Sequence, residues 1–398
     1  MATVAERVRD RVERFHGDRR ISDRTGRPFL HGRPPRAGDV ALSSNDYLAL
    51  SADRRIAQAC TPAWAPGADP AHGEVDPNTL AQRLARYMHA DAGIVCQSGW
   101  DANIGLLQAI ADPETPVHID EKAHMSLRQG AMMAAAPTHL FRHNDPGHLR
   151  TQIQAHGSGI IAVDAICSTS GSHSPLPELC DVAEETGSVL VVDESHSLGI
   201  DGPEGAGAVV SLGLAARVPF RTASLAKAFA GRAGFVAVHD RDFVGYFESA
   251  SYPAVFSSAL RAHDLAGLAA TLEVIRAADP RRARLREKSA SVRNALSCMG
   301  FDLAGSDSQI VSLPTGPEAH ALAVRDVLEW HGVLGSPFCA PATPPGRSLI
   351  RFSLHAALSE QDIERIILAC TDIRDSIGVT PCVATECSAR PCPPEPGR

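Results

Sequence analysis

The sequence predicts an α/β protein, with a mostly parallel sheet covered by helices on both faces and a smaller α+β domain after it. The first observation is that short apolar runs alternate with amphipathic segments between residues 93 and 238. Strands that alternate with helices of ten or more residues form parallel sheets. The second observation is a change after residue 258, where two long helical segments precede short strands and helices. We therefore expect a functional site at the carboxyl ends of the parallel strands.

The elements follow from local patterns. An apolar stripe of Val4, Val8, Val12 and Phe15 predicts a helix over 3–15, and the polar, Gly- and Pro-rich stretch 17–38 predicts a hairpin or extended arm. In the central part we expect a loop at 71–79, helices at 80–89 and 176–185, and strands at 93–97, 117–119, 159–163, 188–192 and 234–238. In the last third we expect helices at 260–278, 283–299, 319–331 and 360–371 and strands at 309–313 and 349–354.

These elements divide the chain into four parts. Residues 1–50 form an N-terminal helix and arm, 51–258 the large α/β domain, 259–378 the α+β domain and 379–398 a tail. The tail has Pro, Ser and Cys without periodicity, so we expect it to be disordered. Its cysteines, Cys382, Cys387 and Cys392, are a weak metal or disulfide candidate because no histidine accompanies them, and no metal site is predicted.

Composition excludes several classes of protein. With 44% hydrophobic and 21% charged residues the chain is neither disordered nor collagen-like. A formal net charge of -8 argues against nucleic acid as a partner. The apolar runs are too short to span a membrane, and the charged N-terminus lacks the apolar region of a signal peptide. Seven cysteines scattered singly among apolar residues indicate buried, reduced thiols in a cytoplasmic protein.

Three segments carry residues suited to chemistry. The strand 188–192 ends in Asp193, with His196 three residues later, although an aspartate that caps a helix beside a structural histidine is an equally simple interpretation. Lys227 lies among small uncharged residues, where desolvation lowers a lysine pKa, but a lysine that reaches solvent from a helix face gives the same pattern. A strand runs into Ser98 and Gly99 before a helix, a turn that can hold phosphate and that is also common elsewhere.

The combination of the three is more specific than each alone. A phosphate cradle, an aspartate at a strand end and a lysine among small residues together describe a pyridoxal phosphate site. A carboxylate must pair with the pyridinium nitrogen, and a lysine must carry the cofactor as a Schiff base. The sequence therefore predicts a pyridoxal 5′-phosphate enzyme that uses Asp193 and Lys227.

Taken as a whole, the sequence resembles the α-oxoamine synthases, which are acyltransferases of the aspartate aminotransferase-like fold type I. The resemblance runs from Ser44 to Arg374, and within the family the chain is most similar to the cholera-type autoinducer synthases. The segments that carry it are SNDYLAL, QSGWDANIGLLQAI, AHMSLRQGA, FRHNDPGHLR, DESHSLG, TASLAKAFAGRAG, SYPAVFSS and GVLGSPFCAPAT. The resemblance implies a homodimer whose active site lies at the subunit interface.

The resemblance also implies roles for individual residues. Lys227 is the Schiff-base lysine, and Asp193, His196 and His124 are the partners of the ring nitrogen, the phenolate and the ring face. Arg351 and Asn45 bind the carboxylate of the amino substrate. The remaining cofactor contacts are Ser98, Gly99, Trp100, Ser168 and Ser224 in one subunit and Ser257 and Ser258 from its neighbour. Residue type alone leaves other interpretations open. Arg351 is also typical of a surface ion pair, and Asn45 is typical of a turn. Ser257 and Ser258 are equally consistent with ordinary serines at the end of a strand.

The resemblance implies a decarboxylative condensation of S-adenosylmethionine or 2-aminobutyrate with a medium- or long-chain acyl-CoA such as decanoyl-CoA. The product is an α-aminoketone, the precursor of an α-hydroxyketone quorum-sensing autoinducer. The alternatives are a housekeeping synthase that uses glycine, alanine or serine, and an aminotransferase. The chain lacks the glycine-rich run that many members carry before residues 73–79, and Asn78 stands where many have histidine. This departure disfavours the three housekeeping substrates.

Overall fold

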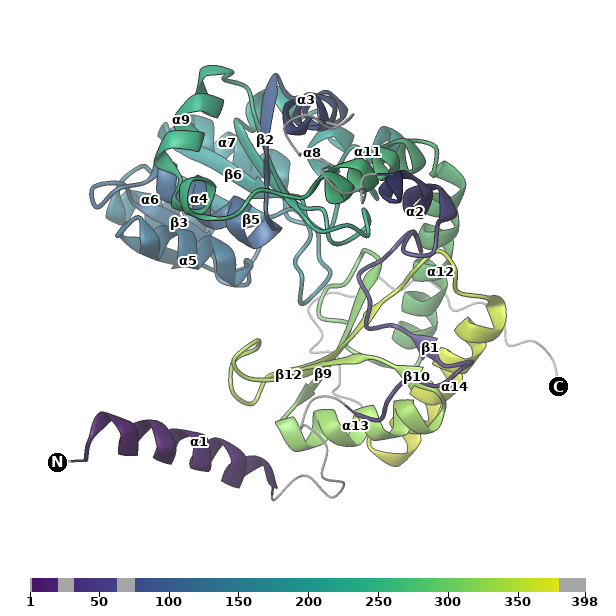
Figure 1. Ribbon diagram of the computed structural model, residues 1–398. Helices are drawn as coiled ribbons and strands as arrows, with labels where there is room; N and C mark the ends of the chain where they lie inside the picture. Colours follow the sequence, from purple (N-terminus) through teal and green to yellow (C-terminus); the bar gives the residue numbers. More distant parts are fainter. Residues whose placement is uncertain (1, 21–31, 63–75, 379–398) are drawn as a thin grey trace.

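The computed structural model describes residues 2–20, 32–62 and 76–378 and forms two lobes (Figure 1). The larger lobe is built on a seven-stranded sheet in the order β2-β8-β7-β6-β5-β3-β4. Of these strands only β8 runs against the others. The strands are β2 (Ala92–Cys96), β3 (Val117–Asp120), β4 (Thr138–Phe141), β5 (Ile160–Asp164), β6 (Val189–Asp193), β7 (Phe220–Ser224) and β8 (Gly234–Val238).

Helices cover both faces of this sheet, because its central strands are apolar on both sides. Along β5, Ile160 and Ala162 pack with one cluster of buried residues and Ile161 and Val163 with another. The first cluster includes residues of α4 (Gly99–Ile110), α5 (Met125–Met133) and α9 (Asp242–Ala250). The second includes residues of α6 (Pro146–His156), α7 (Leu176–Thr186) and α8 (Ala208–Ser211). The carboxyl ends of β3, β5, β6 and β7 thus meet at one edge between two layers of helices.

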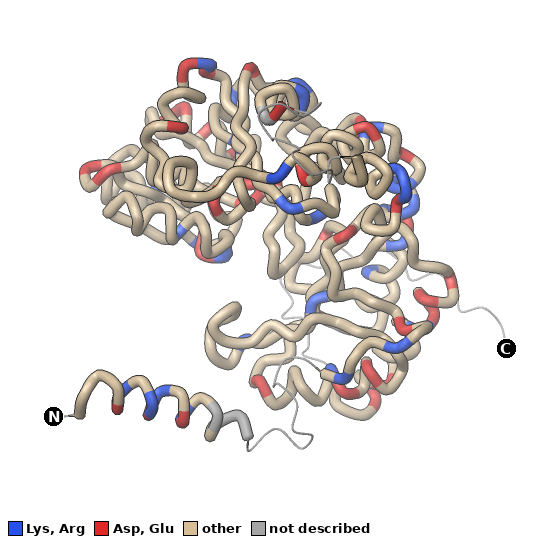
Figure 2. The backbone as a smooth tube through the Cα atoms, in the orientation of Figure 1, with Lys and Arg blue, Asp and Glu red and all other residues tan. Residues whose placement is uncertain are grey.

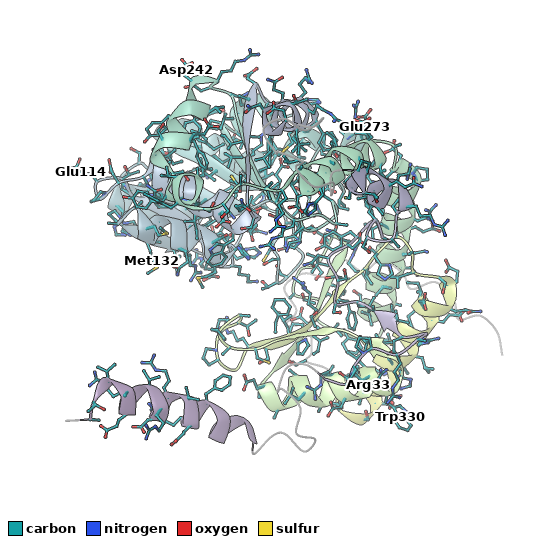
Figure 3. All side chains as sticks on the ribbon, in the orientation of Figure 1. Arg33, Glu114, Met132, Asp242, Glu273 and Trp330 are labelled. Atoms are coloured by element: carbon teal, nitrogen blue, oxygen red, sulfur yellow. The ribbon has the colours of Figure 1, made fainter. Side chains whose placement is uncertain are left out.

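The smaller lobe contains an antiparallel sheet in the order β11-β12-β9. Its elements are β9 (Ile310–Gly316), α13 (Glu318–Trp330), β10 (Val333–Leu334), β11 (Ser336–Phe338), β12 (Ser348–Ser353) and α14 (Glu360–Ser376). The N-terminal segment belongs to this lobe, since β1 (Val40–Ala41) pairs with β10 and Arg33 binds Asp39 in a fork of 2.6 and 2.7 Å. Arg33 and Trp330 lie together at its far side (Figure 3).

Three further helices connect the lobes. They are α2 (Arg54–Cys60), α11 (Ala262–Arg276) and α12 (Asp279–Cys298), and α11 packs on both α2 and α3 (Pro77–Tyr87). The short α10 (Tyr252–Phe256) follows α9, and α1 (Val4–Arg20) lies apart from both lobes in Figure 1. Val4, Val8, Val12 and Phe15 of α1 are all exposed. The apolar stripe that predicts this helix is therefore not part of a buried core of the described residues.

Most expected elements are present, with shifts of a few residues at their ends. The first helix continues to Arg20, so the expectation of an arm from residue 17 is wrong for its first four positions. The strands β4 and β7 were not expected. The expectation of buried cysteines holds for four of the seven: Cys167, Cys180, Cys339 and Cys370. Cys60 and Cys96 are half-buried, and Cys298 is exposed, so the expectation is wrong for Cys298. The expected disordered tail, its three cysteines and most of the loop at 71–79 lie outside the described residues.

In Figure 2, acidic and basic residues are interspersed over both lobes. Within residues 2–20, 32–62 and 76–378, every helix is too short or too polar to cross a bilayer.

Candidate active site

Three aspartates end three parallel strands at one edge of the large sheet. Asp120 ends β3, Asp164 ends β5 and Asp193 ends β6, and all three are buried. Asp164 and Asp193 lie side by side because they are partners in the register of β5 and β6. Burial, together with the neighbouring Asp193, raises the pKa of Asp164 well above its ordinary value. This edge therefore concentrates acidic groups where the fold leaves room for a ligand.

Each carboxylate oxygen of Asp193 accepts one hydrogen bond. The amide nitrogen of Ser195 donates to Oδ1 at 2.8 Å, and Nδ2 of Asn103 donates to Oδ2 at 2.6 Å. Asn103 is itself held by Thr222, whose hydroxyl donates to Oδ1 of Asn103 at 2.5 Å. The second proton of the Asn103 amide reaches Oγ of Ser126 at 2.8 Å. Asp193 is thus fixed by groups from two different elements, α4 and the turn after β6.

The chain of hydrogen bonds continues from Ser126 to His124. Oγ of Ser126 accepts from Asn103, so its own proton is donated to Nδ1 of His124 at 2.7 Å. This assignment leaves the proton of the neutral imidazole on Nε2. Burial of its inner side lowers the pKa of His124, and the positive charge of Lys227 lowers it further while Asp193 opposes the shift. The residue is nevertheless exposed, and its ring meets Trp100 edge-on, with ring centroids 5.9 Å apart.

The backbone also fixes His124. It is the N-cap residue of α5, and its amide donates to both carboxylate oxygens of Asp164 at 3.1 Å. The carboxylate beside Asp193 therefore serves to place the histidine that begins the next helix.

His196 is buried and neutral at physiological pH. Burial lowers its pKa well below the ordinary value, and the charges of Lys227 and Arg351 act in the same direction. Its Nδ1 lies 2.7 Å from the hydroxyl of Tyr47, and its carbonyl oxygen accepts from Nε2 of Gln309 at 2.8 Å. The sequence-predicted pair Asp193 and His196 is thus present at one strand end and is held by both lobes.

Lys227 lies in the turn that follows β7, not on a helix face. Its side chain is half-buried, and this burial lowers its pKa below that of an ordinary lysine. The positive charge of Arg351 lowers the pKa further, whereas Asp193 raises it. A lysine amine in such surroundings is a better nucleophile and base near neutral pH than one in water.

The start of α4 packs tightly against β7 and β8. A Cβ atom on Gly99 would lie 2.5 Å from Cβ of Ser224, and one on Gly234 would lie 2.0 Å from the carbonyl oxygen of Ser98. Only glycine allows the chains this close. Ser98 caps the helix by accepting from the amide of Asp101 at 3.1 Å, which leaves the amides of Gly99 and Trp100 without helical acceptors. Such a helix start suits a phosphate group.

Arg351 comes from the small lobe, on β12, and is buried against the site. Its Nη1 donates to the carbonyl of Ser168 at 2.8 Å and its Nη2 to Oδ1 of Asn45 at 3.0 Å. Its Nε is buried with no hydrogen-bond partner. The guanidinium lies over the ring of Phe338, 4.6 Å from the centroid. A buried arginine that has, among the residues the structure describes, an open donor and no carboxylate in ion-pair contact is suited to bind an anionic ligand.

Comparisons with known proteins agree with this geometry. Residues 37–369 match the model of the aminotransferase class I and II family. The chain belongs to this family. It is 42% identical over 348 residues to a CAI-1 autoinducer synthase of Vibrio campbellii, a match that covers 86% of this chain and 88% of that protein. It is 30% identical to a putative 8-amino-7-oxononanoate synthase of Halalkalibacterium halodurans, with 81% and 84% covered.

Solved structures show the same fold. A serine palmitoyltransferase of Sphingomonas wittichii superposes with a TM-score of 0.85 at 22% identity, covering 95% of this chain and 100% of that one. An 8-amino-7-oxononanoate synthase of Francisella tularensis has a TM-score of 0.77 at 21% identity, covering 86% and 100%. The expected fold type I is confirmed. The protein is an acyltransferase of the α-oxoamine synthase type and depends on pyridoxal phosphate.

The residues present fit that cofactor. The amides of Gly99 and Trp100 at the start of α4 could hold its phosphate, and the carboxylate of Asp193, fixed at both oxygens, could pair with a pyridinium nitrogen. Lys227 has the lowered pKa that Schiff-base formation needs. Of the residues predicted from the sequence, Ser257 and Ser258 alone lie elsewhere. They follow α10 on the outside of the chain, where both are exposed and Ser257 donates to the carbonyl of Pro253.

Sequence reasoning missed four residues that hold the site: Asn103, Ser126, Asp164 and Tyr47. Asp164 could have been predicted as a site residue, because it ends an apolar run in the same way as Asp193 does. Asn103 had a weaker signal, a polar amide between the apolar residues Ala102 and Ile104 of α4. Ser126 and Tyr47 lie in segments that carry the family resemblance, but nothing in residue type alone assigns them a hydrogen bond.

Proposed function

We propose that this protein condenses an amino acid with a medium- or long-chain acyl-CoA, with loss of carbon dioxide, to give an α-aminoketone. The observation that carries the proposal is the position of Arg351. Among the described residues its buried Nε has no hydrogen-bond partner. The charge of Arg351 lowers the pKa of Lys227, and both charges act on the pKa of His196, which indicates that the two side chains belong to one site. Together they suit a substrate that has both an amine and a carboxylate.

Bound pyridoxal phosphate supplies an electron sink for negative charge at the Cα atom of the amino substrate. Lys227 holds the cofactor and, once displaced by the substrate, accepts the Cα proton, for which its lowered pKa is suited. Asp193 keeps the pyridine nitrogen protonated, and its bonds from Asn103 and Ser195 hold it in place. His196 and Ser168 would hold the ring oxygen of the cofactor, and Ser98, Gly99, Trp100 and Ser224 would hold its phosphate.

His124 has a second task in this proposal. Its Nε2 carries a proton because Nδ1 accepts from Ser126, and the residue is exposed. It can therefore cover the cofactor ring and donate to the thioester carbonyl oxygen as the Cα atom attacks. The new carbon–carbon bond forms as the bond to the CoA sulfur breaks, and the carboxylate held by Arg351 and Asn45 then leaves as carbon dioxide.

The 42% identity to a CAI-1 autoinducer synthase supports S-adenosylmethionine or 2-aminobutyrate as the amino substrate and decanoyl-CoA as the acyl donor. The product would then be a precursor of an α-hydroxyketone signal. The test is a thiol-release assay with mass spectrometry of the products. It crosses decanoyl-CoA and acetyl-CoA with these two amino substrates and with glycine, alanine and serine.

Release of CoA with decanoyl-CoA and either of the first two amino substrates supports the proposal. Turnover with glycine, alanine or serine instead would place the protein with the housekeeping synthases, to which it is also related at 30% identity and above. Exchange of the amino group with a keto acid, without CoA release, would identify an aminotransferase.

We also propose that the working unit is a homodimer in the cytoplasm. Apolar side chains are exposed on α10 and at the start of α4, among them Phe256, which is 81% exposed, and Trp100. Because α10 packs on α4, these residues lie on one face together with Ser257 and Ser258. A second copy on this face would bury them and bring its two serines to the cofactor phosphate. Light scattering gives the mass, and S257A/S258A should weaken cofactor binding without changing that mass.

A further inference from the structure

The segment His143–Asn144–Asp145 is part of the family resemblance, but none of its residues lies among those assigned to the cofactor or the substrates. Asp145 has a local role, because its Oδ1 accepts from the amide of His148 and caps α6. The side chains of His143 and Asn144 instead form hydrogen bonds with a neighbouring hairpin, residues 165–174, that follows β5. These contacts link the segment to the candidate site.

His143 connects the end of β3 to this hairpin. Its Nδ1 lies 2.9 Å from Oδ1 of Asp120, which makes Nδ1 the protonated nitrogen, and its Nε2 lies 2.8 Å from Oγ of Ser172. Asp120 also accepts from the amides of Lys122 and Asn144, at 2.8 and 2.9 Å. The histidine is therefore fixed at both nitrogens.

Asn144 holds the next two positions of the hairpin. Its Nδ2 donates to the carbonyl of His173 at 2.9 Å, and its Oδ1 accepts from the hydroxyl of Ser174 at 3.1 Å. Its φ is +55°, a conformation that asparagine tolerates and most other side chains do not. Three consecutive hairpin residues, Ser172, His173 and Ser174, are thus bound by two consecutive residues of another loop.

The hairpin is closed by backbone hydrogen bonds and carries the contact to Arg351 at its other end. Backbone bonds join Ser174 to Ala165 and Cys167 to Ser172 at 3.0 and 2.9 Å. The four carbonyls at its tip all accept from side chains of the small lobe. The pairs are Ser168 with Arg351, Thr169 with Ser312, Ser170 with Ser306 and Gly171 with Ser308.

We propose that His143 and Asn144 are positioning residues for the binding of the substrate carboxylate. They anchor the base of the 165–174 hairpin, and the hairpin places the carbonyl of Ser168 that orients the guanidinium of Arg351. This inference rests on the proposed function, in which Arg351 binds that carboxylate. The linked Asp120, His143 and Ser172 are not a hydrolytic triad, since Ser172 is only 8% exposed and its hydroxyl is also bound to Ser170 at 2.8 Å.

The experiment measures equilibrium binding to the cofactor-loaded protein in the absence of acyl-CoA, from the absorbance of the cofactor. The ligands are 2-aminobutyrate and propylamine, which has the same carbon chain without the carboxylate. The variants are His143→Ala, His143→Gln, which keeps a donor, and Asn144→Gly, which suits the positive φ. His239→Ala is the matched control, because His239 also bridges an aspartate and a carbonyl, Asp91 and Ala215 at 3.1 and 2.7 Å, in a different loop.

We expect His143→Ala and Asn144→Gly to raise the Kd for 2-aminobutyrate roughly tenfold, since a displacement of about 1 Å is costly at such a site. The Kd for propylamine should not change, His143→Gln should recover part of the loss, and His239→Ala should have no effect. In an Arg351→Ala background, His143→Ala should add nothing.

Two results would overturn the inference: an unchanged Kd for 2-aminobutyrate, or an equal weakening of both ligands. Labelling of Ser172 by a fluorophosphonate would do the same, because it would show an exposed nucleophile. If Arg351→Ala itself leaves the binding of 2-aminobutyrate unchanged, the proposed function fails at its carboxylate site. That failure is separate from a failure of His143.

Discussion

The hydroxyl of Tyr47 lies 2.7 Å from Nδ1 of the His196 imidazole and is fully buried beside it. The same hydroxyl lies 3.2 Å from Oδ1 of Asn45, which also accepts from Arg351 and Ser353. Tyr47 thus joins His196, which we propose holds the cofactor oxygen, to Asn45, which we propose binds the substrate carboxylate. Two subsites that come from different lobes share one hydroxyl.

Tyr47→Phe should therefore affect both stability and catalysis. The substitution leaves a buried imidazole nitrogen without its partner, so we expect a loss of about 1–3 kcal/mol in the free energy of unfolding. Denaturation in urea measures this, and kcat should fall roughly tenfold because His196 is no longer held. Tyr246→Phe, which removes a hydroxyl bound to the carbonyl of Ala109 at 2.6 Å, is the control and should leave kcat unchanged. Equal kcat values for the two variants would contradict the prediction.

Lys227→Ala should remove the covalent attachment of the cofactor. In the native protein, borohydride reduction should add the mass of the reduced cofactor to the peptide that contains Lys227. The variant should show no such adduct, and kcat should fall by roughly 10³-fold or more because both nucleophile and base are lost. Lys288→Ala is a control outside the site. An adduct on any other lysine of the native protein would refute the assignment.

Asn103→Ala should destabilise the protein and loosen the cofactor. It removes the donor at 2.6 Å from Asp193 and leaves the hydroxyl of Thr222 unpaired, at a cost of about 1–3 kcal/mol. Cofactor affinity, measured by equilibrium dialysis, should fall because the carboxylate is no longer oriented. Gln108→Ala, on the same helix but bonded to Ala250 and Tyr252, should retain the native affinity. A native affinity in Asn103→Ala would show that the amide is dispensable.

His173 predicts a pH dependence of stability. It lies between Asp201 of the large lobe and Asp307 of the small lobe, at 3.3 and 2.7 Å. Burial lowers its pKa, but hydrogen bonds to Asp201 and Asp307 and their charges more than offset this, raising it to about 10. Since the pKa is higher in the folded state, the stabilisation is complete below about pH 6.5 and is lost as the pH rises toward 10.

His173→Gln should flatten this pH dependence. Midpoints of urea unfolding at pH 6 and at pH 9.5 should differ less in the variant than in the native protein. The variant should be the less stable of the two chiefly at the lower pH. If the difference between the two midpoints is the same in both proteins, His173 is not the group that titrates.

Much of the fold was predictable because its signals are local. The strands β5, β6 and β8 are uninterrupted apolar runs, and an aspartate or a glycine marks where they begin or end. The strand β7 was not predicted because Arg221 interrupts its apolar pattern. Arg221 is nevertheless fully buried and donates to the carbonyl of Met88. The polar side chain in such a strand is hydrogen-bonded to groups that are distant along the chain, and a local sequence pattern does not show these partners.

The residues of the candidate site also differ in whether local sequence patterns predict them. Asp193, His196 and Lys227 were predictable because their chemistry is rare in those settings, and they lie close together in sequence. Asn103 and Tyr47 act through partners 90 and 149 residues away, at distances that only the folded chain defines. The roles assigned to individual residues stay predictions that the variants above test.

The tip of the 165–174 hairpin has a consequence for how this protein tolerates substitution. At Ser168, Thr169 and Ser170 the bond to the small lobe is made by a backbone carbonyl, which every amino acid provides. The donors Arg351, Ser312 and Ser306 use side chains, which a substitution removes. Gly171 is the exception on the acceptor side, because its φ is +73° and a Cβ would lie 2.1 Å from the carbonyl of Ile310. A saturation-mutagenesis screen should therefore find that the half-buried Thr169 tolerates substitution better than the facing donors Ser312 and Ser306, and that Gly171 tolerates none.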